Sequence, residues 1–176
     1  MKTAVCNELF GTMDFGKTCE LLATHGFDGI EIAPFTLARE SGVPTDADLA
    51  AAHDLITTNG LRFAGLHWLL ARPTGLNITS NDEAVRTRSW EHLETLLSVA
   101  GQLGGGNLIL GSPNQRSYRE IDHREATTRL IDGFRHVADV AAANSSKLLI
   151  EALPKTATNL VNTIEEALDL VEQVGH

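Results

Sequence analysis

Short apolar runs alternate along the chain with longer segments whose apolar residues recur at helical spacing. The runs are residues 3–6, 29–33, 62–68, 107–110 and 148–153. Each run is the right length for one strand of a buried sheet, and each intervening segment is long enough for a helix. Strand and helix therefore alternate about five times, which predicts an α/β fold with parallel strands joined by right-handed crossovers.

Helix starts are marked by a Ser, Thr or Asp that is followed three residues later by an acidic residue. This spacing is typical of a capping box. The pairs are Thr45 and Asp48, Ser80 and Glu83, Asp122 and Glu125, and Thr163 and Glu166. Residues 35–44 and 72–79 are expected to be long loops, and the second loop is long enough to act as a lid over the strand ends.

The last apolar run contains a single carboxylate, Glu151, shortly before Pro154. A parallel strand is covered on both faces, and an unpaired carboxylate inside it is costly. Glu151 is therefore expected at the carboxyl end of its strand, which is the active-site end in strand–helix barrels. The alternative is a solvated Glu151 in a surface loop.

Three further polar residues fall at or near predicted strand ends. Alternation with a period of two puts Glu31 on the side of its strand that faces a barrel interior or its mouth. The same period puts His67 on one face with Phe63. Glu8 lies just past the end of the first strand. We therefore expect these three polar residues to converge with Glu151 at one end of the sheet.

His67 and Arg116 each have an open alternative. The other six histidines fall on predicted helices or at their ends, but His67 at a strand end is also compatible with a hydrogen-bonded structural role. Arg116 closes a polar loop, residues 111–116, that is suited to gripping a sugar hydroxyl or a phosphate. The alternative is a polar turn with an exposed Arg116.

The chain is acidic, with a net charge of −9 and a pI near 5.2. Surfaces that hold a nucleic-acid backbone are usually basic, which argues against a nucleic-acid partner. The two cysteines, Cys6 and Cys19, match no metal-ligand spacing or disulfide framework, and Cys19 falls on a predicted helix as a core residue. No signal peptide or apolar run of membrane-spanning length is present. These features predict a cytoplasmic protein without a membrane partner.

Several segments at the strand ends form an ordered series. They are Cys6-Asn7-Glu8, Asp28-Gly29-Ile30-Glu31, Gly65-Leu66-His67-Trp68, Leu110-Gly111-Ser112-Pro113, Ile150-Glu151-Ala152-Leu153-Pro154 and Asn162-Thr163-x-Glu165-Glu166-Ala167. In this order and spacing they resemble the N-terminal part of the xylose isomerase-like TIM barrel superfamily, specifically its sugar phosphate isomerase/epimerase family. An intact barrel has eight strands and typically about 250 residues. Residues 1–176 are therefore expected to be a single barrel domain that is truncated at its C-terminus, with about five of eight strand–helix units.

The resemblance also implies a set of site residues. Proteins of that family hold a divalent metal, commonly Mn, Mg, Co or Zn, through a Glu, an Asp, a His and a second Glu at the strand ends. Glu151 matches the first of these ligands and would be one half of an acid/base pair, while the other three ligands belong to strands six to eight. By the same resemblance His67 is a second catalytic residue, and Glu8, Glu31 and Arg116 are substrate-binding residues.

The function implied is a metal-dependent sugar or sugar-phosphate isomerase or epimerase, which moves a proton next to a carbonyl of a small sugar-like substrate. Because three ligands lie outside the sequence, the chain as given is expected to be inactive and metal is expected in the complete form. Two alternatives stay open. One is an apurinic-site endonuclease-like relative, and the other is a non-catalytic barrel remnant that self-associates.

The strand count has a consequence for assembly. An open set of five parallel strands leaves two edges unpaired and apolar inner positions such as Phe63 uncovered. Such surfaces rarely persist on a soluble monomer. We therefore expect the chain to bury them against a second copy, most simply as a two-fold homodimer, or else to aggregate.

Overall fold

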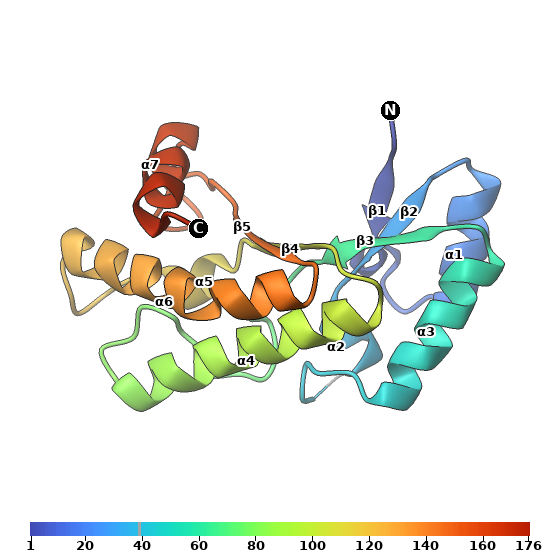
Figure 1. Ribbon diagram of the computed structural model, residues 1–176, viewed down its shortest axis with the longest axis horizontal. Helices are drawn as coiled ribbons and strands as arrows, with labels where there is room; N and C mark the ends of the chain where they lie inside the picture. Colours follow the sequence, from blue (N-terminus) through green and yellow to red (C-terminus); the bar gives the residue numbers. More distant parts are fainter. Residues whose placement is uncertain (39) are drawn as a thin grey trace.

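Five parallel strands form one sheet and follow one another across it in chain order (Figure 1). The computed structural model describes residues 1–38 and 40–176. The strands are β1 (Ala4–Cys6), β2 (Gly29–Ile32), β3 (Arg62–Leu66), β4 (Asn107–Leu110) and β5 (Lys147–Ile150). The predicted α/β class with about five parallel strands of a barrel is confirmed.

Helices connect the strands and continue the chain after β5. The longer helices are α1 (Phe15–Thr24), α3 (Asp46–Thr58), α4 (Glu83–Gln102), α6 (His123–Ala143) and α7 (Ile164–Val174). Single turns follow three of the strand ends, namely η1 (Asn7–Phe10), α2 (Pro34–Leu37) and α5 (Pro113–Arg116). The expected loop over residues 35–44 therefore begins inside α2, where Pro34 suits the first helical position. No helix in the described ranges is long and apolar enough to cross a membrane.

Three of the four predicted helix starts are confirmed by side-chain caps. The capping residues are Thr45 for α3, Asp122 for α6 and Thr163 for α7. The fourth prediction is wrong, because Asp82 rather than Ser80 caps α4. The Asp82 carboxylate accepts hydrogen bonds from the backbone N–H groups of Ala84 (2.9 Å) and Val85 (3.3 Å). A carboxylate at this end is also favoured by the helix dipole.

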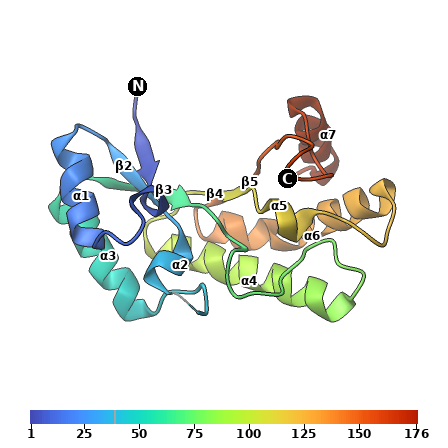
Figure 2. The ribbon, with the colours of Figure 1, turned by 180° about the vertical axis from the view of Figure 1, so that it is seen from behind.

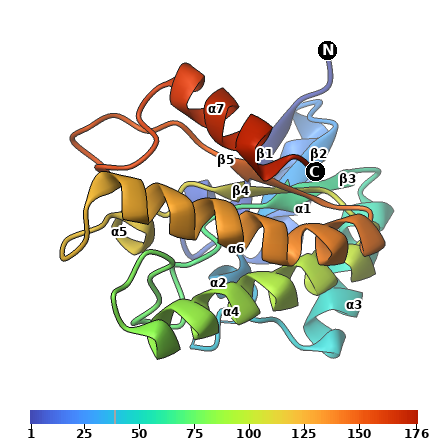
Figure 3. The same ribbon diagram turned by 60° about the vertical axis from the view of Figure 1, so that its left-hand side comes forward.

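One face of the sheet is packed against helices. Residues paired across parallel strands lie on the same side of the sheet, so the register assigns each side chain to a face. Members of the helix-covered face are at most 1% exposed: Ile30, Ile32, Leu66, Leu108 and Leu110. Helices α4 and α6 run side by side along it (Figures 1 and 3). On the other face Leu149 of β5 is 38% exposed.

A register shift in β3 corrects the predicted alternation. Phe63 pairs with Ile30, whereas Gly65 pairs with Glu31, so Ala64 is an extra residue in the ladder. Phe63 therefore lies on the helix-covered side with Ile30, and the expectation that Phe63 shares a face with His67 is wrong. A β-bulge inserts one residue into the strand, so every side chain beyond it points to the opposite face. A prediction based on a strict period of two does not include this change.

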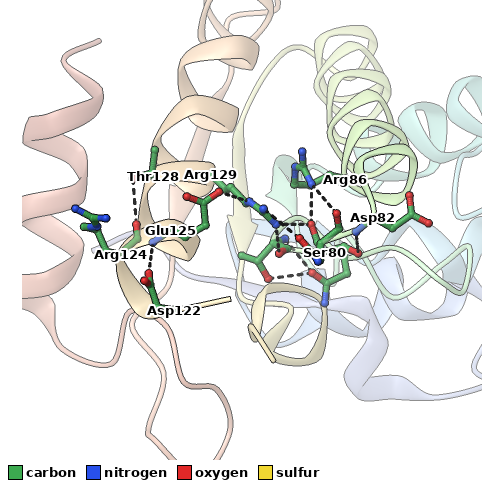
Figure 4. Close-up of polar contacts among 11 residues, drawn as sticks. Ser80, Asp82, Arg86, Asp122, Arg124, Glu125, Thr128 and Arg129 are labelled. Atoms are coloured by element: carbon green, nitrogen blue, oxygen red, sulfur yellow. Dashed lines mark hydrogen bonds and ion pairs between the residues drawn. The ribbon is translucent and has the colours of Figure 1, made fainter. Parts of the chain in front are cut away.

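The loop that follows β3 is held in place by polar contacts. Ile78 N–H donates to the carbonyl of Gln115 at 2.8 Å, and the Thr79 hydroxyl donates to the carbonyl of Arg116 at 3.2 Å. The Ser80 carbonyl accepts from Arg129 Nη1 of α6 at 2.7 Å and from Arg86 of α4 at 2.8 Å (Figure 4). This end of the expected lid is therefore tied to α4, α5 and α6.

An apolar groove of about 780 Å³ lies between α6, β5 and α7. Its lining includes Leu149 together with Ile164, Leu168 and Val171, and these three residues of α7 are more than half exposed. Figure 2 shows α7 at the β5 end of the sheet, far from β1. The last strand and the last helix thus leave apolar surface in contact with water, which costs roughly 25 cal/mol per Å² relative to burial.

We propose that a second copy of the chain covers this groove. Leu168→Lys should weaken self-association, because it puts a charge into a buried apolar contact. Leu21→Lys is the matched control, since Leu21 is a partly exposed leucine of α1, outside the groove. Sedimentation equilibrium at micromolar concentration measures the effect. A wild-type chain that stays monomeric contradicts the proposal.

Candidate active site

Side chains from four strand ends meet on the open face of the sheet. Cys6 of β1 pairs in register with Glu31 of β2. Glu31 Oε2 lies 3.5 Å from His67 Nδ1, and Glu151 Oε2 lies 4.0 Å from His67 Nε2. One ligand-type atom from each of Cys6, Glu31 and His67 lies within 4.8 Å of the other two. The imidazole of His67 therefore lies between two carboxylates. The Cys6 sulfur lies near the side of the ring that faces Glu31.

The backbone at these strand ends positions the side chains tightly. His67 N–H extends the β2–β3 ladder by donating to the Ile32 carbonyl at 3.0 Å. The next residue, Trp68, is left-handed with φ 58°, and Ser112 at the end of β4 is left-handed with φ 34°. Left-handed non-glycine residues cost on the order of 1–3 kcal/mol each and cluster at functional sites. Both sharp turns come directly after a residue that faces Glu151, namely His67 or Gly111.

The neighbours of His67 favour its protonated form. Interactions with the Cys6 sulfur and then with the Glu31 carboxylate raise the pKa of His67 to about 10, against the opposing effect of partial burial. Its folded-state pKa thus lies above the value of about 6.5 in an unfolded chain. The stabilisation from this protonation is complete below about pH 6.5 and is lost as the pH rises through about 10.

Glu151 lies against β4 and near a buried cation. A Cβ at position 111 would meet the Glu151 carboxylate, so any larger residue there would push this carboxylate out of its position. Arg116 is fully buried, which makes the alternative of an exposed turn arginine wrong. Its Nη1 donates to the Leu110 carbonyl at 3.2 Å, while Nε and Nη2 have no protein partner among the described residues. Burial lowers the pKa of Arg116 to about 10, and the charge of Glu151 opposes this decrease.

Glu8 is the one expected member that no polar contact among the described residues joins to the cluster. Its backbone carbonyl accepts from Gly11 N–H within the η1 turn. The buried neighbour Asn7 has the structural role instead, because its side-chain carbonyl accepts from Ala33 N–H at 2.9 Å and its amide donates to the Thr36 hydroxyl at 2.8 Å. Asn7 thereby ties the end of β1 to the end of β2.

Cys6 is the site residue that sequence reasoning missed. The linear spacing of the cysteines gives no ligand motif, yet Cys6 lies two residues after Ala4 on a strand whose partner position is Glu31. Alternation in the first strand combined with the β1–β2 register is the signal that identifies it. The other cysteine, Cys19, is buried in α1 as predicted, and desolvation first and the charge of Asp14 second raise its pKa to about 11.

Comparison with known proteins identifies the family of the chain. Residues 19–176 match the family model described as xylose isomerase-like TIM barrel. The chain belongs to this family.

Its relatives include sugar epimerases. The chain is 29% identical to the D-psicose 3-epimerase of Ruminiclostridium cellulolyticum over 167 residues, which is 93% of this chain and 54% of the relative. It is 28% identical to the L-ribulose 3-epimerase of a Methylomonas species, with 87% and 50% of the two chains covered. A crystal structure of D-psicose 3-epimerase in the presence of D-fructose superposes with a TM-score of 0.81 at 25% identity, covering 99% of this chain and 60% of that one. The chain thus spans about half the length of the curated relatives it matches.

The charge of His67 is directly testable in metal-free protein. NMR titration should show its imidazole protonated throughout the neutral range, and Glu31→Gln should lower its pKa because the change removes a charge partner while keeping the shape of the side chain. His92 serves as the internal reference, since burial lowers its pKa. A His67 that titrates at or below pH 6.5 in the wild-type chain contradicts the assigned pairing.

Proposed function

We propose that this chain forms the N-terminal part of a ketose 3-epimerase-type barrel, in which Glu151 transfers a proton at a carbon next to a carbonyl. The observation that carries the proposal is the Glu151 carboxylate on the open face, 4.0 Å from the imidazole of His67. The similarity to D-psicose and L-ribulose 3-epimerases supports a small ketose, free or phosphorylated, as the substrate class.

The chemistry needs a base and a group that stabilises the enediolate charge. Glu151 is partly exposed and can reach a substrate carbon as the base. Its distance of 4.0 Å from His67 Nε2 is too long for a hydrogen bond. The Nε2–H group is therefore free to donate to a substrate oxygen, and the positive charge of His67 favours an oxyanion there.

Trp68 and Arg116 contribute to this end of the sheet in different ways. Trp68 is 44% exposed and its ring centroid lies 6.3 Å from that of His67, which provides an apolar wall. Arg116 is fully buried, and its charge attracts Glu151. In this arrangement Arg116 acts on the carboxylate rather than on the surface that a substrate would first meet.

The metal implied by the resemblance needs more donors than these residues supply. Among the described residues, His67 Nε2 is the other possible metal ligand that lies near the Glu151 carboxylate. Arg116 is a cation and cannot bind a metal ion. One carboxylate and one shared imidazole do not make the four-ligand set. We therefore assign no step to a metal at Glu151 in this chain, and we expect residues 1–176 to be inactive by themselves.

The two alternative functions considered from the sequence have less support than the proposed epimerase function. The net charge of −9 disfavours an apurinic-site endonuclease, because phosphate binding needs basic surface. A non-catalytic remnant predicts that Glu151 has no role even when the barrel is complete. The experiment on Glu151 separates this alternative from the proposed function.

In a complete barrel that contains this chain, Glu151→Gln should reduce turnover by roughly 10²–10⁴-fold, the usual contribution of a general base. His67→Asn should cause a smaller loss. Exchange of the substrate C–H proton with solvent deuterium, followed with D-psicose or D-fructose, reports the step directly. Glu20→Gln on α1 is the control carboxylate variant. Near-normal exchange of the substrate proton in the Glu151→Gln protein would contradict the proposal.

A further inference from the structure

We propose that Cys6, Glu31 and His67 form a binding site for a zinc-like divalent ion, separate from the metal position that the family resemblance assigns to Glu151. The three residues come from the ends of β1, β2 and β3. All three belong to the described part of this chain, so the site needs no strand beyond those present. The proposal does not depend on the proposed epimerase activity.

The spacing of the donors fits a tetrahedral ion. With metal–nitrogen and metal–oxygen bonds of about 2.0–2.2 Å, a tetrahedron places its nitrogen and oxygen ligands roughly 3.4 Å apart. The observed distance between His67 Nδ1 and Glu31 Oε2 is 3.5 Å. Direct hydrogen bonds of this type are usually 2.7–3.2 Å long, so the pair is spaced more like two ligands of one ion. The Cys6 donor lies within 4.8 Å of both, close enough for small side-chain rotations to complete the site.

The backbone holds the three donors ready for an ion. Cys6 and Glu31 are partners in the β1–β2 ladder, and the ladder extends to His67 through its N–H bond to the Ile32 carbonyl. Asn7 locks the β1 end by accepting from Ala33 N–H. Binding therefore requires little ordering of the chain, which favours affinity.

The donor types select the ion. A thiolate, an imidazole and a carboxylate suit Zn²⁺, whereas Mg²⁺ and Mn²⁺ prefer oxygen ligands. Cys6 and His67 each release a proton when the ion binds, and the thiolate and Glu31 carboxylate then balance its two positive charges. Cys6 is 9% exposed, and the His67 and Glu31 side chains are about one-third exposed or less. The site is thus partly desolvated yet open to an entering ion, with the fourth position left for water.

The geometry also separates this site from Glu151. Glu31 faces Nδ1 of the His67 ring, whereas Glu151 faces Nε2. An ion bound through Nδ1 lies on the far side of the ring from Glu151 and does not require that carboxylate as a ligand.

Cobalt titration of the metal-free chain tests the proposal, because Co²⁺ bound to a thiolate gives a charge-transfer band in the near ultraviolet. The chain has only two cysteines, so the band reports Cys6 or Cys19. We expect a band that saturates at one ion per chain, that Zn²⁺ abolishes and that excess Mg²⁺ leaves unchanged. Cys6→Ser should abolish the band and weaken Zn²⁺ binding by more than the roughly 10–100-fold that loss of an outer partner costs.

Matched variants make the assignment specific. Cys19→Ala should keep the band, Glu31→Gln should weaken Zn²⁺ binding, and Glu151→Gln should keep the band. Circular dichroism confirms that each variant is folded. Absence of the band in the wild-type chain overturns the proposal, as does a band that survives Cys6→Ser but not Cys19→Ala. Binding that is lost in Glu151→Gln and kept in Cys6→Ser would place the ion at Glu151 and overturn it as well.

Discussion

The parallel register of the sheet is the constraint on which the candidate site depends. Parallel strands in chain order bring their carboxyl ends to one edge, and pairing places equivalent positions on the same face. Ile30, Leu66 and Leu108 fill the face against the helices, where a charge would be desolvated at a cost of several kcal/mol. Charged side chains at the strand ends are therefore confined to the open face, and Glu31 and Glu151 meet there around His67.

The charges of the site depend on one another. His67 is held as a cation by neighbours that include Glu31, and Arg116 is a buried cation whose charge Glu151 partly compensates. Removing Glu151 would leave the buried charge of Arg116 without compensation, which costs more than the pair contributes. Substitutions in this group should therefore combine non-additively, in contrast to changes on the outer helices. Gly111 belongs to the same unit for a steric reason, because its missing Cβ is the space that Glu151 occupies.

Much of the fold could be predicted because it is encoded locally. Strands were identified by short apolar runs, and the helices begun by Thr45, Asp122 and Thr163 were identified by caps that act within one turn. The errors arise where a longer-range contact decides. The bulge at Ala64 depends on how β3 fits against β2.

The same distinction holds for the site. Glu31, His67 and Glu151 could be grouped because each lies at or near a strand end. The burial of Arg116 could not be predicted, since it depends on tertiary packing around α5, to which Thr79 and Ile78 of the loop before α4 are hydrogen-bonded. Cys6 could not be identified from its own segment, because its partner Glu31 lies on the neighbouring strand and is distant in the sequence. Alternation predicts which face a residue occupies, but only the register predicts which residue lies beside it.

The two sides of the His67 ring connect the ion proposed at Cys6 with the proton transfer proposed at Glu151. An imidazole that binds an ion through Nδ1 keeps its remaining proton on Nε2, so the ion determines the tautomer. Nε2 is the atom that faces Glu151. Ion binding at Nδ1 would thus keep a hydrogen-bond donor at Nε2. This donor is directed at the space between the imidazole and Glu151. In the absence of an ion, Cys6 and Glu31 favour the protonated ring, and this form also has a hydrogen-bond donor at Nε2. Both states present the same donor to a substrate oxygen, and they differ in the charge behind it.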